Sequence, residues 1–238
     1  MFFFRIQLRR CLFYLGCIAA FAFALMMLHA TNQVRQVSST TSPPIVPVII
    51  VDPGHGGEDG GAVGIGGVVE KELNLAVAMQ LAPFLRALGY DVQLTRCEDC
   101  DLSEPANTLR ERKRSDIQAR HAMLEELRDG DLFLSVHMNR YTSPSARGTQ
   151  VFYSPNHPQS QVMAEQIQRT VVTLLQPENH RQIKPAGSSI YLLHRATRPA
   201  VMVECGFISN PGEAAHLQDA AYQRQLAFAV AVGVLGGA

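Results

Sequence analysis

The sequence lacks an excess of charge of either sign. Lys and Arg number 21, Asp and Glu number 21, and the formal net charge at pH 7 is zero. Charged residues make up only 18% of the chain. A protein without a basic excess has little with which to neutralise phosphates, so nucleic acid is excluded as a partner.

The chain also has too few cysteines for a disulfide-built scaffold. Of its five cysteines, Cys11 and Cys17 lie in an apolar N-terminal run and Cys205 in an expected strand. Cys97 and Cys100 form a lone C-x-x-C pair, and the second pair that a zinc site of this type needs is absent. We expect either a local disulfide or two free thiols there. Internal repeats, low-complexity blocks and a second folded domain are absent as well.

Long apolar runs occur mainly at the N-terminus. Arg5, Arg9 and Arg10 precede the uncharged segment 11–28, and a basic flank before an apolar core is typical of an export signal. We predict a signal anchor over residues 1–30, with a membrane helix at about 11–28, and a flexible linker over 31–44. The folded domain, residues 45–238, is then extracytoplasmic and membrane-anchored. A cleaved signal, and so a secreted protein, is the alternative, although Leu28 occupies a position where cleavage requires a small residue.

Short β-rich runs alternate with amphipathic stretches in the rest of the chain. This pattern predicts a single α/β domain whose sheet is covered by helices on both faces. The first helix begins after residue 69 with a stripe of Leu73, Val77, Leu81, Leu85 and Leu88, and ends at Gly89. Pro83 should kink or break this helix. The expected strands are 47–54, 90–96, 131–139, 148–154 and 200–210, and the other expected helices are 109–131, 158–175 and 220–237.

The helix expected at 109–131 begins with a basic cluster, residues 110–114. Such a cluster could bind an anionic ligand. A solvated helix start with salt bridges is the simpler interpretation, and we favour it.

Four residues whose side chains can bind a metal or take part in catalysis stand at or near the C-terminal ends of predicted strands. They are His55, His137 and Glu204, with Glu70 in the connection that follows the first strand. The carboxyl ends of strands are where ligands bind in α/β sheets. Two imidazoles and a carboxylate form a common zinc ligand set, with a further carboxylate available to move protons. Each residue has a structural alternative: a loop hydrogen bond for His55, core packing for His137, and a helix-dipole contact for Glu70. Glu204 is the hardest to explain structurally, because burying an unpaired carboxylate in an apolar strand is costly.

Glycines surround His55 in the segment "VDPGHGGEDGGAVG", residues 51–64. They allow the backbone to turn sharply and leave room for a substrate. We expect shared metal coordination, rather than the loop itself, to hold His55 in place. The remaining histidines are interpreted as structural or solvated: His29, His121, His157, His180, His194 and His216.

Four segments resemble the signature blocks of the zinc-dependent N-acetylmuramoyl-L-alanine amidases, the amidase-3 family. They are "VDPGHGGEDGGAVG", "VVEKELNL", "LFLSVHMN" and "VMVECGFISNPGEA", and they occur in the family's order. The resemblance implies a mostly parallel sheet of about six strands flanked by helices. It also implies that His55, Glu70 and His137 are ligands of one catalytic Zn²⁺ and that Glu204 is the catalytic glutamate. The substrate implied is peptidoglycan, cut between the lactyl group of N-acetylmuramic acid and L-alanine.

Within that family the chain most resembles the CwlD type, the small membrane-anchored amidases of spore-forming bacteria. That likeness implies a role in spore cortex maturation, through muramic-δ-lactam formation needed for germination, and a possible lipoprotein activator. Residues 148–167 run from strand to helix without room for an autoinhibitory insertion, so control would come from localisation, expression or a partner. The alternatives are a vegetative autolysin with the same chemistry and a non-catalytic, membrane-tethered cell-wall binder.

Overall fold

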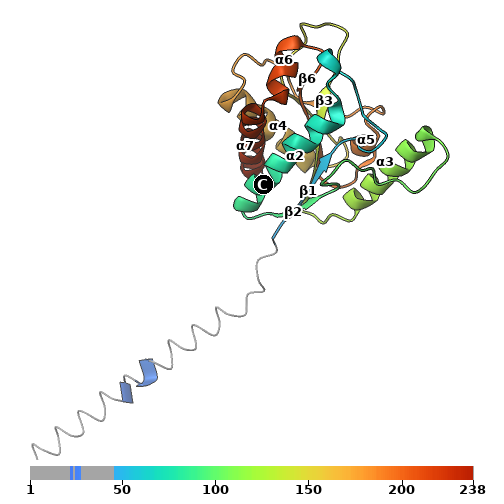
Figure 1. Cartoon of the computed structure of the whole chain (residues 1–238). Helices are drawn as coiled ribbons and strands as arrows, with labels where there is room; N and C mark the ends of the chain where they lie inside the picture. The colour runs from blue at the N-terminus through green and yellow to red at the C-terminus, as the bar shows by residue number, and fades with distance from the viewer. Residues whose placement is uncertain (1–21, 24, 28–45, 238) are drawn as a thin grey trace, which may run out of the picture. The chain divides into compact units, whose positions relative to one another are not determined.

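Six strands form one sheet in the order β2-β1-β3-β6-β4-β5 in the computed structural model, which describes residues 22–23, 25–27 and 46–237 (Figure 1). β2, β1, β3 and β6 are mutually parallel, whereas β4 runs antiparallel to β6 and parallel to β5. The predicted mostly parallel sheet of about six strands is therefore confirmed. The strands are β1 (Val48–Pro53), β2 (Asp91–Leu94), β3 (Leu132–Asn139), β4 (Gln150–Tyr153), β5 (Lys184–Pro185) and β6 (Ala200–Phe207).

Helices cover both faces of this sheet, as predicted (Figure 1). The apolar side chains of α2, α4 and α7 share one core cluster with Val51, Leu134 and Val203 of the sheet. Residues of α3 and α5 share the second cluster with Ile50 and Phe133, because successive strand residues point to opposite faces. The helices are η1 (Ile65–Gly67), α2 (Glu70–Ala87), α3 (Leu109–Glu125), α4 (Pro158–Leu174), α5 (Tyr191–Arg195), α6 (Pro211–Gln218) and α7 (Ala220–Gly237).

Helix α2 continues through Pro83, so of the two outcomes expected there, a kink or a break, the break is wrong. Pro83 lies on the exposed side of the helix, where water can satisfy the carbonyl that loses its partner. The predicted stripe is buried from Leu73 to Leu85, but Leu88 is outside it, since it caps the helix and is 37% exposed. Gly89 follows with a φ of 94°, as a helix end requires.

Helix α3 begins with a capping box, in which Thr108 accepts from the Glu111 N–H and the Glu111 carboxylate accepts from the Thr108 N–H. The basic start of this helix forms salt bridges, as favoured above. Arg112 pairs with Glu58 at 2.9 Å and Lys113 with Asp59 at 2.6 Å. Both acidic partners lie on the loop that follows β1, so α3 is attached to the segment that carries the first predicted site residue.

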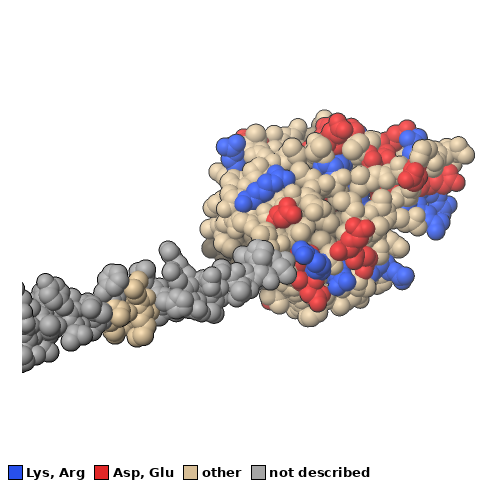
Figure 2. Space-filling model, turned by 90° about the horizontal axis from the view of Figure 1, so that it is seen from below, with Lys and Arg blue, Asp and Glu red and all other residues tan. Residues whose placement is uncertain are grey.

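The surface mixes both signs of charge. On the face in Figure 2, Lys and Arg side chains alternate with Asp and Glu rather than forming a field of one sign. Cys97 and Cys100 are free thiols, so the second of the two alternatives for this pair holds. The predicted anchor and linker, residues 1–44, lie outside the described residues except at 22–23 and 25–27. Within the described part, no helix is both long and apolar enough to cross a membrane.

Candidate active site

The site lies at the C-terminal edge of the sheet, on the face covered by α3 and α5. Along β3, Phe133 contributes to the apolar core on this face, and Ser135 and His137 follow at two-residue spacing. In the neighbouring strand, Glu204 lies directly opposite His137 in register. The apolar core of this face therefore gives way to polar side chains at the strand ends.

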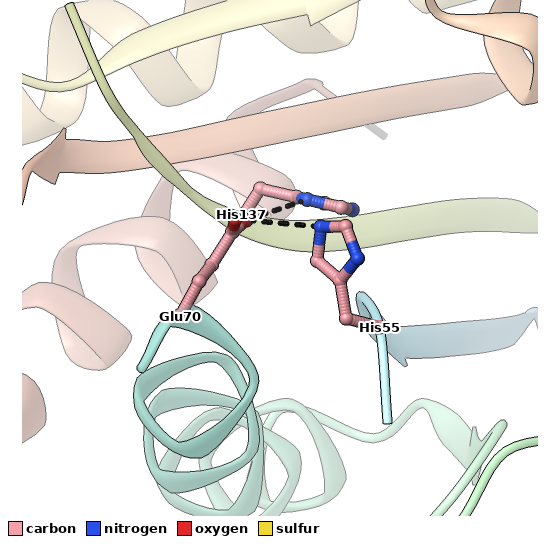
Figure 3. A group of neighbouring side chains, drawn as sticks. All are labelled: His55, Glu70 and His137. Atoms are coloured by element: carbon pink, nitrogen blue, oxygen red, sulfur yellow. Dashed lines mark hydrogen bonds and ion pairs between the residues drawn. The ribbon is translucent and has the colours of Figure 1, made fainter. Parts of the chain in front are cut away.

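Three of the predicted residues converge on one point (Figure 3). Oε1 of Glu70, from the first turn of α2, lies 3.0 Å from Nδ1 of His137 and 3.3 Å from Nε2 of His55. One ligand atom from each side chain lies within 4.8 Å of the other two. The two rings meet edge to face, with centroids 5.0 Å apart. Together they form a possible metal site.

Glu70 is oriented by several donors besides the histidines. Its Oε2 accepts a hydrogen bond from the Ala62 N–H at 2.8 Å, and its Oε1 accepts one from the Met138 N–H at 3.2 Å. Asn74, one turn further along α2, also donates to Oε1 at 3.4 Å. Glu70 is thus a buried carboxylate aimed at the histidines, not a free dipole partner at the start of the helix.

His55 is held by its own loop, contrary to expectation. Its Nδ1 lies 2.8 Å from Oδ2 of Asp59, which leaves Nε2 facing Glu70. Its φ of 61° is the one positive value at a non-glycine residue in the described part of the chain. Such a conformation persists only where the surroundings impose it.

Two buried arginines impose that conformation through the backbone. Arg96 donates to the carbonyls of Pro53 and Gly54 at 3.0 and 3.1 Å. Arg120, from α3, donates to the carbonyls of Pro53 and His55 at 3.1 and 2.9 Å. Three successive carbonyls are therefore fixed by side chains from distant segments.

Arg120 is itself held by a buried acidic network. It pairs with Asp52, which is fully buried, and its Nε donates to Asp116 at 2.8 Å. The Thr95 and Ser135 hydroxyls each donate to Asp52 at 2.7 Å. Burial acts to raise the pKa of Asp52, but Arg120 and the two hydroxyls hold the pKa below its usual range.

Two glycines allow the ligands to approach each other. A Cβ at Gly54 would lie 2.1 Å from Nε2 of His137. At Gly61, which has a φ of 69°, a Cβ would lie 2.6 Å from Oε2 of Glu70. The glycines near His55 thus provide room for the cluster itself as well as a turn.

The electrostatics of the cluster favour a cation. Burial lowers the pKa of His55, but Asp59 and Glu70 outweigh burial and raise the pKa to about 9. Burial acts to raise the pKa of Glu70, yet His137 and His55 keep the pKa of this carboxyl well below its usual range. A proton on His55 therefore occupies a place that a metal ion can take, with release of that proton.

Glu204 lines the cavity beside the cluster. This cavity has a volume of about 270 Å³, and its walls include His55 and His137 together with Ile117 of α3 and Tyr191 of α5. Oε2 of Glu204 is buried and has no hydrogen-bond partner among the described residues. Burial raises the pKa of Glu204 to about 7, with His137 and His55 opposing the rise and Glu70 adding to it. A buried acceptor without a partner requires an explanation, and a reacting molecule in the cavity provides one.

The structure therefore brings all four predicted residues to one edge of the sheet. Sequence reasoning missed Asp59, Arg96 and Arg120. Asp59 could have been found from its position four residues after His55, in the same glycine-rich segment. Arg120 lies on one helical line with Asp116 and Leu124, and all three are buried. Nothing in the sequence indicates that this face of α3 packs against the loop after β1.

A cluster of two histidines and one carboxylate beside a buried glutamate, at the carboxyl edge of a parallel sheet, is the arrangement of a metal-dependent hydrolase. Residues 49–235 match the family model of N-acetylmuramoyl-L-alanine amidases, Amidase_3, and the chain belongs to this family. It is an enzyme that acts on peptidoglycan.

Relatives extend the match over most of the chain. The germination-specific N-acetylmuramoyl-L-alanine amidase of Bacillus subtilis is 34% identical over 189 residues, which is 79% of this chain and 78% of that protein. The amidase AmiA of Escherichia coli is 30% identical over 79% of this chain and 75% of its own length. Among solved structures, the CwlD amidase of Clostridioides difficile in complex with the GerS lipoprotein is similar, with a TM-score of 0.76 and 31% identity over 80% of this chain and 98% of that one. The likeness to a CwlD-type amidase is confirmed.

Proposed function

We propose that His55, Glu70 and His137 bind one Zn²⁺ and that Glu204 is the catalytic glutamate. The reaction is hydrolysis of the amide between the lactyl group of N-acetylmuramic acid and L-alanine. The observation that carries this proposal is the convergence of three ligand atoms within 4.8 Å of one another, beside a buried carboxylate that lacks a partner.

The donor set fits zinc. Two imidazoles and one carboxylate are a recurring ligand set of catalytic zinc sites. The Asp59 contact to Nδ1 of His55 matches the carboxylate–histidine pairing that orients metal-ligating imidazoles. A zinc ion bound there supplies a Lewis acid that activates water and polarises the scissile carbonyl.

Glu204 is suited to move the proton that hydrolysis requires. A carboxyl with a pKa of about 7 exchanges protons readily near neutral pH. It would accept a proton from the attacking water and then donate it to the departing amine of L-alanine.

The test is substitution of Glu204 with glutamine in the full-length chain. Glu204→Gln should retain zinc and lose about 10²–10⁴-fold in turnover on purified peptidoglycan, since a positioned acid–base group contributes that much. His55→Ala or His137→Ala should instead lose zinc in metal analysis. Glu72→Gln, at an exposed position of α2, serves as the matched control. Near-normal cleavage by Glu204→Gln would refute its role, and full zinc occupancy in the histidine variants would remove them as ligands.

We further propose a role in spore cortex maturation, with action outside the cytoplasmic membrane and attachment through the N-terminal anchor. The germination-specific relative and the CwlD structure support this role. The vegetative autolysin remains the competing function, since the similar AmiA comes from Escherichia coli. Muropeptide analysis of spores from a strain lacking the gene decides between them, because retained muramic-δ-lactam would refute the cortex role.

A lipoprotein activator is a further proposal. The CwlD amidase is similar in structure and is seen in complex with a lipoprotein. Co-purification of the full-length chain with a lipoprotein from sporulating cells, and higher activity in its presence, would support it. Full activity of the isolated chain would argue against it.

A further inference from the structure

A second cavity opens beside the catalytic one on the same face of the sheet. It has a volume of about 560 Å³. Its lining residues include two cations, Arg181 and Lys184, and no Asp or Glu. Its walls also include Asn139, Gln150, Phe152 and Phe207.

The two cavities are neighbours across one pair of strands. Gln150 lies opposite Glu204, and Phe152 lies opposite Met202, in the antiparallel ladder of β4 and β6. Glu204 and Met202 line the catalytic cavity, whereas Gln150 and Phe152 line the second. A ligand can therefore extend from one cavity to the other by crossing a single strand spacing.

Arg181 is fixed in a defined position in the second cavity. Its guanidinium lies 4.3 Å from the centre of the Phe207 ring, and its Nε donates to the Arg147 carbonyl at 2.6 Å. Its Nη1 donates to Oε1 of Gln150 at 3.3 Å. A guanidinium stacked and anchored in this way is preorganised to bind a carboxylate.

Phe207 can stack there because the register of β6 shifts. His137 of β3 pairs with Glu204 of β6, and Asn139 pairs with Phe207. Between these two pairs β3 advances by two residues and β6 by three, so β6 contains one extra residue. The extra residue brings Phe207 to the face that carries Glu204, as irregularities of this kind do beside active sites. The shift thereby links the position of the catalytic carboxylate to that of the stacked arginine.

Neither cation has an acidic partner. Within the part of the chain that the structure describes, Arg181 and Lys184 form no salt bridge with Asp or Glu. The charge of Arg181 does lower the pKa of Glu213 against the rise caused by burial. That carboxylate, however, accepts hydrogen bonds from the Gly148 and Phe207 N–H groups, both at 2.7 Å, and does not line the cavity. The cavity is thus positively charged and lacks a counter-ion from its own walls.

We infer that this cavity binds the free α-carboxylate of the second stem-peptide residue, the one that follows L-alanine, through Arg181 and Lys184. The inference rests on the proposed function, which puts the scissile amide beside Glu204. Two strand spacings, from β6 to β5, are about 10 Å. An extended peptide advances about 3.5 Å per residue, so the α-carboxylate of the second residue lies roughly 7–8 Å from the scissile carbonyl. That distance lies between one and two strand spacings from β6, where Arg181 contacts Gln150 of β4 and Lys184 projects from β5. In stem peptides this residue is glutamate linked through its γ-carboxyl, with its α-carboxyl free or amidated. The site therefore selects for the free acid.

Binding to the full-length Glu204→Gln protein tests the inference without turnover. The probes are N-acetylmuramoyl-L-alanyl-D-glutamate and N-acetylmuramoyl-L-alanyl-D-isoglutamine, which differ only in whether the α-carboxyl of the second residue is free or amidated. The Glu204→Gln protein, which is the parent of the variants below, should bind the acid about tenfold more tightly than the amide, as expected for a charge-assisted hydrogen bond. Lys184→Met should reduce this preference several-fold, and Lys184→Arg should restore it. Arg169→Met, at an exposed position on α4 beyond the opposite face, should leave the preference unchanged.

The outcomes separate this inference from the function on which it rests. Equal affinity for the two probes in the parent protein would overturn the subsite, as would a preference that persists in the Lys184→Met/Arg181→Gln double variant. Hydrolysis assays with the unsubstituted protein address the proposed function independently. Failure of that protein to release stem peptides from peptidoglycan, even with the proposed lipoprotein activator added, would overturn the function, whatever the binding data show.

Discussion

Substitution of Arg120 with methionine tests whether the network under the loop after β1 holds the site. Methionine keeps most of the side-chain length but removes the charge and all five donors. The variant loses the pairs with Asp52 and Asp116 and the hydrogen bonds to two backbone carbonyls. Asp52, which is fully buried, is left without a cation. Removing one partner of a buried pair costs about 3–5 kcal/mol, a large part of the roughly 5–15 kcal/mol by which domains are stable.

Urea denaturation at pH 7, with a chelator present, measures this loss as a lower midpoint at an unchanged m-value. Arg114→Met, at an exposed position of the same helix, should change the free energy of unfolding by less than about 0.5 kcal/mol. Asp52→Asn combined with Arg120→Met should be more stable than Arg120→Met alone, because the double variant no longer buries the charge of Asp52.

The pH dependence of the free energy of unfolding gives a sharper test than its value at pH 7. With Arg120 present, the pKa of Asp52 lies below its unfolded value, so its stabilisation is complete above about pH 4 and is lost as the pH falls through the folded pKa. In Arg120→Met the Thr95 and Ser135 hydroxyls still oppose burial, but the charge of Arg120 is gone, so the pKa of Asp52 rises. The penalty is therefore greatest at neutral pH and fades as Asp52 takes up a proton. The difference between the two proteins should therefore shrink from pH 7 to pH 4.5. A loss below about 1 kcal/mol at pH 7, or one that is constant with pH, would refute the reasoning.

The remaining predictions concern the ligands and one helix cap. Gly54→Ala should lose bound zinc in metal analysis while keeping its far-ultraviolet circular dichroism, because the added Cβ would displace the ring of His137. Asp59→Asn should weaken zinc binding about 10–100-fold in a competition assay with a chromogenic chelator, because it alters the partner of Nδ1 of His55. Thr108→Ala should lower the free energy of unfolding by about 1 kcal/mol in urea, since it removes the cap of α3.

Two matched variants keep these tests specific. Gly187→Ala adds a Cβ where nothing lies within 4 Å, so it should retain zinc. Glu58→Gln removes a carboxylate on the same loop that pairs with Arg112 and not with a ligand, so its zinc affinity should remain near that of the parent. Zinc loss in either control would show that zinc binding is sensitive to substitutions that do not touch the ligands or their partners. The specific roles of Gly54 and Asp59 would then be unsupported.

The sequence was sufficient to predict which residues meet at the edge of the sheet. Parallel strands end at the same edge, so His137 and Glu204 could be placed there from the apolar runs that precede them. The supporting residues could not be predicted, because their roles depend on packing between distant segments. Arg120 lies in a highly charged helix, and only the position of that helix under β1 shows that its side chain is buried. The continuous course of α2 through Pro83 likewise depends on which side of the helix faces water.

The arginine contacts to the loop after β1 have a consequence for anyone who wishes to transplant this site. The loop's backbone is specified by side chains 43 and 65 residues further along the chain. A graft of residues 52–61 onto another parallel sheet would carry the histidine but not the contacts that keep it in a left-handed conformation. The smallest transferable unit is β1 with its loop, together with Arg96 after β2 and Arg120 on α3. A designer should therefore copy this three-part unit before attempting to rebuild the other two ligands.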